Sequence, residues 1–186
     1  MSAFRSLPLS RRALALARFP EPAAKRALDA LLRPAVGERA LWEQAFAARL
    51  FRHVRHPDAV APLSAMLGSR KLAFAFASRW AADALVHQGT PEVVAGLSAA
   101  FLRGGRSFGM NAAGVLGRIK RPESERAVLD LLDVTSDMLV RFPLGVALCE
   151  LCPTEPAALD RIHDLVCTDH VDPRRSSLEE QFLALC

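Results

Sequence analysis

The sequence predicts an all-α protein in which helical hairpins stack as an α-α superhelix, a right-handed solenoid of about five hairpins plus a C-terminal helix. Three observations favour this fold. The chain resembles itself after a shift of about 34 residues, and a proline recurs at one point of each repeat. Alanine and leucine also dominate, while Tyr is absent and aromatic residues make up only 6%. Strands favour aromatic and β-branched residues, so this composition suits packed helices better.

The repeat is clearest where residues 47–67 are laid over 81–101. Nine of the 21 positions are identical, including His53 with His87 and Pro57 with Pro91. Further shifts of 31 to 35 residues bring the prolines at 22, 122 and 156 into the same column. A proline with apolar residues three and four positions apart behind it is typical of the first turn of an amphipathic helix.

Each repeat is therefore expected to contain two helices, the first ending before the proline and the second beginning there. Glycine is expected to end two of the second helices, at Gly68 and at Gly104. In chain order the expected pairs are 10–19 with 22–32, 38–55 with 57–67, 71–87 with 91–102, 106–119 with 122–132, and 137–152 with 156–167. A last helix is expected from Leu178, after a capping box formed by Ser177 and Glu180.

We expect one domain over residues 1–186, because a single hairpin of this size cannot bury its own apolar face. Residues 45–166 hold the clearest repeats, 1–44 a degenerate N-terminal cap, and 169–186 a C-terminal tail and capping helix. The apolar stretches are too short for a secretory signal or a membrane span. A cytoplasmic protein is therefore expected.

The segments 81–94 and 111–123, with the pairs Val140-Arg141 and Ala147-Leu148, resemble the HEAT-like repeats of the phycobilisome-lyase type. The chain departs from that pattern in lacking the usual Asp and Val-Arg near 71 and 106 and in placing Pro143 inside a helix. The resemblance implies an α-solenoid. Members of the family serve as protein scaffolds, as chromophore-attachment factors and, in a distant branch, as DNA glycosylases, so the resemblance does not choose among functions.

The charge is unevenly distributed along the chain. Residues 1–121 carry 19 Lys and Arg against 7 Asp and Glu, whereas residues 122–186 carry 5 against 13, so the net charges are +12 and −8. Such a distribution can attract polyanions to one end or favour head-to-tail self-association. Two solvated surfaces of different composition are the alternative.

Cysteine and histidine near the C-terminus form a C-x2-C-x14-C-x2-H pattern with the spacing of a zinc site, which consists of Cys149, Cys152, Cys167 and His170. The expected helices argue against zinc, because a helix of about 12 residues spans roughly 18 Å and would separate the two halves of the pattern. Buried core thiols are the favoured interpretation, and no metal or other cofactor is predicted.

Basic side chains gather at the ends of the first helices, where they could dock phosphate or carboxylate groups: Arg49, Arg52, His53, Arg55, His56, His87 and Arg118. The alternative, which we favour, is a set of solvated helix ends whose cations interact with the helix dipole. Trp42 and Trp80 are interpreted as packing residues.

Positions of the second helices outside the core are expected to face a partner in a concave groove: Arg26, Ala61, Ser64, Ala95, Ser98, Arg126, Asp130, Asp160 and Asp164. The small residues among them would let a partner helix approach closely, or would only permit tight packing between repeats.

We find no nucleophile motif, phosphate-binding loop or metalloprotease motif, so no catalytic residue and no enzyme activity are predicted. The expected function is a non-catalytic scaffold or adaptor that binds a segment of another protein in the groove or on the charged rims. Binding of nucleic acid through the basic residues 1–121 is the alternative. A lyase- or chaperone-like factor for a cofactor-bearing protein ranks third.

Overall fold

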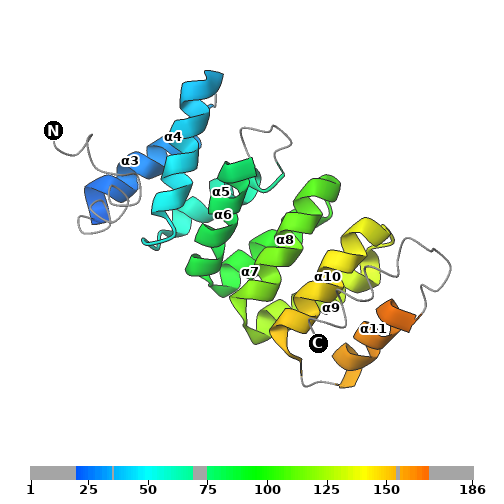
Figure 1. The fold of residues 1–186 in the computed structure, drawn as a ribbon. Helices are drawn as coiled ribbons and strands as arrows, with labels where there is room; N and C mark the ends of the chain where they lie inside the picture. Colours follow the sequence, from blue (N-terminus) through cyan, green and yellow to red (C-terminus); the bar gives the residue numbers. More distant parts are fainter. Residues whose placement is uncertain (1–19, 35, 69–74, 154–155, 168–186) are drawn as a thin grey trace. The chain divides into compact units, whose positions relative to one another are not determined.

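The computed structural model describes residues 20–34, 36–68, 75–153 and 156–167, and these residues form helices and turns without any strand. The prediction of an all-α fold is confirmed for this part of the chain (Figure 1). In the same residues no helix combines the length and the apolar character that crossing a bilayer requires. The helices expected at 10–19 and from Leu178 lie outside the described residues.

The helices in order are α3 (Pro20–Leu32), α4 (Gly37–Leu50), the 3-10 turn η1 (Pro57–Ala59), α5 (Val60–Met66), α6 (Ala75–Gln88), α7 (Pro91–Phe101), α8 (Gly105–Ile119), α9 (Pro122–Val134), α10 (Met138–Leu151) and α11 (Pro156–Cys167). Prolines open η1, α7, α9 and α11, as the sequence predicts, because a first turn leaves its N–H groups without intrahelical partners. The helix expected from residue 22 begins at Pro20 instead.

One expected helix is wrong in extent. The helix over 38–55 ends at Leu50, and residues 51–56 form a turn instead. His56 is extended, at φ −151° and ψ 118°, because the residue before a proline is disfavoured in the helical region. The second helix then opens with a 3-10 turn, because Pro62 has no N–H to donate to the carbonyl of Asp58 four residues earlier.

The chain divides into two compact units, residues 1–96 and 97–186. In the first unit α4 packs against α3 and α6, and α5 packs against α6 and α3. The ring of Phe46 stacks on Trp80, 34 residues later, and Arg52 pairs with Asp83, 31 residues later. The later residue of the first segment, Arg52, contacts the later residue of the second, Asp83, so α4 and α6 run parallel. The fully buried side chains of this unit include Phe51, Leu63, Leu67 and Leu85.

In the second unit α10 packs against α8, α9 and α11. A Cβ on Gly109 would meet Val140, and one on Gly117 would meet Ala147, so α8 and α10 also run parallel, about 30 residues apart in sequence. The absence of side chains at these two glycines lets the helices approach closely. The fully buried side chains here include Leu116, Leu132, Leu144 and Leu148.

Asp137 fixes the start of α10. Its carboxylate accepts a hydrogen bond from the N–H of Leu139 at 3.1 Å and one from Nε of Arg106, in the first turn of α8, at 2.8 Å. The hydrogen bond from Arg106 is the main reason that the pKa of Asp137 lies below its usual value. The side chain thus caps one helix and links the beginnings of two neighbouring helices.

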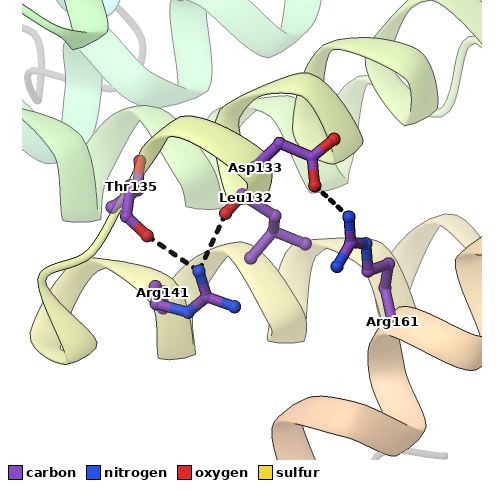
Figure 2. Close-up of polar contacts among 5 residues, drawn as sticks. All are labelled: Leu132, Asp133, Thr135, Arg141 and Arg161. Carbon is purple, nitrogen blue, oxygen red and sulfur yellow. Dashed lines mark hydrogen bonds and ion pairs between the residues drawn. The ribbon is translucent and has the colours of Figure 1, made fainter.

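Side chains of α4, α6 and α10 also form hydrogen bonds with the C-terminal end of the helix that precedes each of them. The amide of Gln44 donates to the carbonyls of Leu31 and Arg33, and the hydroxyl of Ser78 donates to Leu67. In the second unit Nη1 of Arg141 donates to the carbonyls of Leu132 and Thr135 at 2.9 and 2.8 Å (Figure 2). An ion pair between Asp133 and Arg161 joins α9 to α11 beside it (Figure 2). The hydrogen bonds from Gln44, Ser78 and Arg141 satisfy carbonyls that a helix end leaves without partners.

The contact between α8 and α10 can be tested with alanine at Gly117. Its Cβ would lie 2.8 Å from the Cα of Ala147 and 3.0 Å from the Cβ of that residue. The helices would have to separate, and we expect Gly117→Ala to lower the free energy of unfolding by about 1–3 kcal/mol in urea denaturation.

Gly114 in the same helix is the matched control, since nothing lies within 4 Å of a Cβ there. Because alanine loses less backbone freedom than glycine on forming a helix, Gly114→Ala should raise the free energy by about 0.5–1 kcal/mol. Equal effects of the two substitutions would contradict the close packing of α8 and α10.

Candidate functional site

The predicted basic cluster at the end of α4 is present, but most of its arginines already have partners. The guanidinium of Arg49 lies 5.3 Å from the centre of the Trp80 ring. Nε of Arg52 is 3.4 Å from the carboxylate of Asp83, and Nε of Arg55 donates to the carbonyl of His87 at 3.2 Å. Their charge is therefore partly used to hold α4 and its turn against α6.

Of the remaining predicted members, His53, His56 and His87 lie on the same turn or at the end of α6, in the first unit. Arg118 lies exposed in the last turn of α8, in the second unit. Six of the seven predicted anion-docking residues therefore lie in the first unit, in the last turns of α4 and α6 and in the turn after α4.

A buried glutamine, absent from the predicted site, determines the shape of this turn. Gln88 is 3% exposed, and its amide donates to the carbonyls of Val54 at 3.0 Å and Phe51 at 3.4 Å. Its Oε1 accepts from the N–H of His56 at 3.0 Å. The repeat comparison obscured this residue, because the shift of 34 aligns it with Val54 rather than with another polar residue.

The pKa of the His87 imidazole depends on its burial and on the charged groups around it. Partial burial, and then the positive charges of Arg55 and His53, lower the pKa of His87 from 6.5. A second positive charge is thus disfavoured here, and the neutral ring is favoured in the folded protein.

A row of aromatic rings lies on α4 and α6. Trp42 stacks on Phe46 at a centroid distance of 6.1 Å, Phe46 on Trp80 at 6.0 Å, and Phe76 approaches Trp80 at 6.4 Å. We call these four residues the aromatic row. The two inner rings are half-buried, whereas Trp42 is 39% and Phe76 is 60% exposed. The interpretation of Trp42 as a packing residue is therefore incomplete, since its ring both packs and faces solvent.

The predicted groove residues are distributed over both units. Arg26, Ala61 and Ala95 are exposed in the first unit, and Arg126, Asp130, Asp160 and Asp164 are exposed in the second; Ser98, also there, is half-buried. Ser64 is 8% exposed, and its buried hydroxyl has no hydrogen-bond partner among the described residues. The prediction that Ser64 faces a partner from outside the core is wrong, because Ser64 is buried in α5 together with Leu63 and Met66.

The predicted zinc ligands are only partly described. Cys149 is buried in α10, and Cys152 is exposed at the end of that helix, where its φ of 52° places it in the left-handed region. The side chain of Cys167 and all of His170 lie outside the described residues. Within the described part of the chain, no three His, Cys, Asp or Glu side chains gather as a metal site.

Comparison of the chain with protein-family models, with curated proteins and with solved structures gives no match.

Gln88 is expected to contribute strongly to stability, because replacing it with leucine leaves two carbonyls and one N–H without their partner. Unpaired buried polar groups cost about 1–3 kcal/mol each, so Gln88→Leu should lower the free energy of unfolding by about 2–4 kcal/mol in urea denaturation. His87→Ala, at the exposed neighbouring position, should change it by less than about 0.5 kcal/mol. A cost for Gln88→Leu no larger than the control's would contradict this role.

The lowered pKa of His87 predicts how stability depends on pH. Below pH 6.5 the unfolded chain binds a proton at this histidine more readily than the folded protein does. The free energy of unfolding should therefore fall as the pH drops below 6.5, level off below the folded pKa, and show no dependence on this group above pH 6.5. His87→Gln should reduce the slope when unfolding is measured by circular dichroism between pH 5 and 8. An unchanged slope in that variant would contradict the assignment.

Proposed function

We propose that this chain is a non-catalytic adaptor that binds a segment of another protein. The observation that carries the proposal is the aromatic row on α4 and α6, whose outer rings, Trp42 and Phe76, are exposed. Aromatic residues and arginine are enriched at the centres of protein interfaces, where they account for much of the binding energy. Here the row also has Arg49 against it.

A HEAT-like solenoid, with about five hairpins and a C-terminal helix in a right-handed superhelix, is part of this proposal. It is supported by the side-by-side parallel packing of α4 with α6, and of α8 with α10, at offsets of 30–34 residues. In a solenoid each unit contacts mainly its neighbours, and equivalent helices lie next to each other. The bonds that Gln44, Ser78 and Arg141 make to preceding helix ends support the same interpretation.

The aromatic row suits a protein segment because it is held in place before binding. Each ring rests on its neighbour, so binding would order few new side chains. Arg49 over Trp80 and exposed Arg79 give the surroundings a positive character. A segment with apolar side chains flanked by carboxylates would complement this surface.

Nucleic-acid binding through the basic residues 1–121 is supported less well. Arg49, Arg52 and Arg106 already contact groups of the protein, which leaves less of their charge for phosphates. Phe46 and Trp80 stack on each other, so those two faces are not platforms for bases. We also propose that the protein is located in the cytoplasm.

The aromatic row can be tested with the double variant Trp42→Ser and Phe76→Ser. Both side chains are exposed, so the fold should persist while binding weakens. The full chain would be immobilised, a protein that it retains would be identified, and the dissociation constant of its binding segment would be measured by calorimetry. We expect the double variant to weaken binding about 10- to 30-fold.

Two controls separate the aromatic row from other surfaces. Leu102→Ser removes another exposed apolar side chain, and Ala95→Trp fills the small-residue surface of α7. Both should bind as the unmodified chain does. A loss with Ala95→Trp and none with the double variant would instead assign binding to the second helices.

A further inference from the structure

A hollow of about 640 Å³ lies in the first unit between α3 and the turn that follows α4. Ala24, Lys25 and Leu28 line it from α3, and Arg55, His56 and Asp58 line it from the turn and η1. It therefore combines an apolar wall with two cations, an imidazole and one carboxylate. Lys25 comes from a different element than Arg55 and His56, so the basic groups surround the hollow from two sides.

The turn holds its two basic residues firmly. Gln88 binds the carbonyl of Val54 and the N–H of His56, the residues on either side of Arg55. Nε of Arg55 donates to the carbonyl of His87 at 3.2 Å. Arg55 lines the hollow, and with Nε engaged its two terminal amino groups are the donors that it can offer a ligand. Because the guanidinium is already held, little freedom is lost when it binds.

His56 carries an unsatisfied group at the edge of the hollow. Its Nδ1 is buried without a hydrogen-bond partner among the described residues, and the nearest carboxylate oxygen, on Asp58, is 4.0 Å away. The ring meets Phe51 edge-on at 6.3 Å, which limits its rotation. A buried polar atom without a partner is costly, and binding sites are among the places where such atoms occur.

We propose that this hollow is a binding site for a phosphate group. Phosphate presents several strongly accepting oxygens in a tetrahedral arrangement, and these match donors that approach from α3 and from the turn. Arg55 supplies a planar pair of donors from the turn, and Lys25 supplies a compact charge from α3. A carboxylate offers only two oxygens to the same donors. Asp58 opposes the ligand's charge and weakens its binding.

The proposal does not depend on the adaptor function. The aromatic row and the hollow share no residue, so either can fail without the other.

The test titrates the ¹⁵N-labelled full chain with inorganic phosphate and, separately, with O-phosphoserine, at constant ionic strength, and follows the amide signals of Arg55 and His56 by NMR. We expect saturable shifts at these amides with both ligands. Equal affinities would identify a site for the free anion, and tighter binding of phosphoserine would identify a site for a phosphorylated side chain. Shifts no larger than those caused by added chloride would overturn the proposal.

Four variants make the test specific. Lys25→Gln and Arg55→Gln should each weaken phosphate binding about tenfold, as expected for a lost charge-assisted hydrogen bond. Lys120→Gln, which removes an exposed lysine of α8's end, should leave it unchanged. Asp58→Asn should strengthen it several-fold, because it removes the opposing charge without changing the size of the side chain.

Asp58→Asn also guards against a trivial loss of structure, since a variant that binds more tightly has kept its site. Circular dichroism melting of all four variants checks their folding. An equal loss with Lys120→Gln would show that the response comes from net charge rather than from the hollow. Weaker binding with Asp58→Asn would contradict the placement of the ligand beside Asp58.

Discussion

A helix that ends inside a repeat leaves backbone carbonyls without partners, and the way these carbonyls are satisfied shapes the described structure. Side chains of later helices bind them: Gln44 at the end of α3, Gln88 after α4, Ser78 after α5 and Arg141 after α9. Because an unpaired buried carbonyl is costly, each of these bonds favours one placement of the later helix. The same hydrogen bonds therefore satisfy the end of one helix and fix the position of the helix that packs against it.

Internal contacts of a different kind explain why the basic residues offer a ligand less charge than their number indicates. A chain with +12 net charge over residues 1–121 must distribute that charge, and several arginines serve internal contacts. Arg49 lies over Trp80, Arg52 pairs with Asp83, and Arg106 binds the cap of α10. Arg55 differs, because it donates a hydrogen bond from Nε to the carbonyl of His87 and also lines the hollow. The number of basic residues is therefore a poor guide to the charge that a ligand meets.

The aromatic row shows a related division of roles. Phe46 and Trp80 pack α4 against α6, and this packing supports two outer rings that remain exposed. Exposed aromatic side chains are costly in solvent unless a partner covers them, and their support by inner rings prepares them for contact. In the proposed adaptor, the inner rings would contribute to stability and the outer rings to binding, so inner and outer positions should respond differently to substitution.

The sequence by itself determined most of the described helices and their order. Apolar residues at spacings of three and four and prolines in the first turn are local signals, and the helices opened by prolines at 57, 91, 122 and 156 were predicted from them. The repeat of about 34 residues also indicated which helices are equivalent. These features depend on residues within one or two turns of each other, which a sequence displays directly.

Only the tertiary structure decided where α4 ends, which polar groups are satisfied and which side chains remain open to a ligand. Gln88 contacts residues 32 to 37 positions earlier, and its role depends on their carbonyl directions. The burial of Ser64, the exposure of Trp42 and the position of Lys25 and Arg55 on one hollow follow from how separate helices pack. Such contacts join residues far apart in sequence, and no local pattern records them.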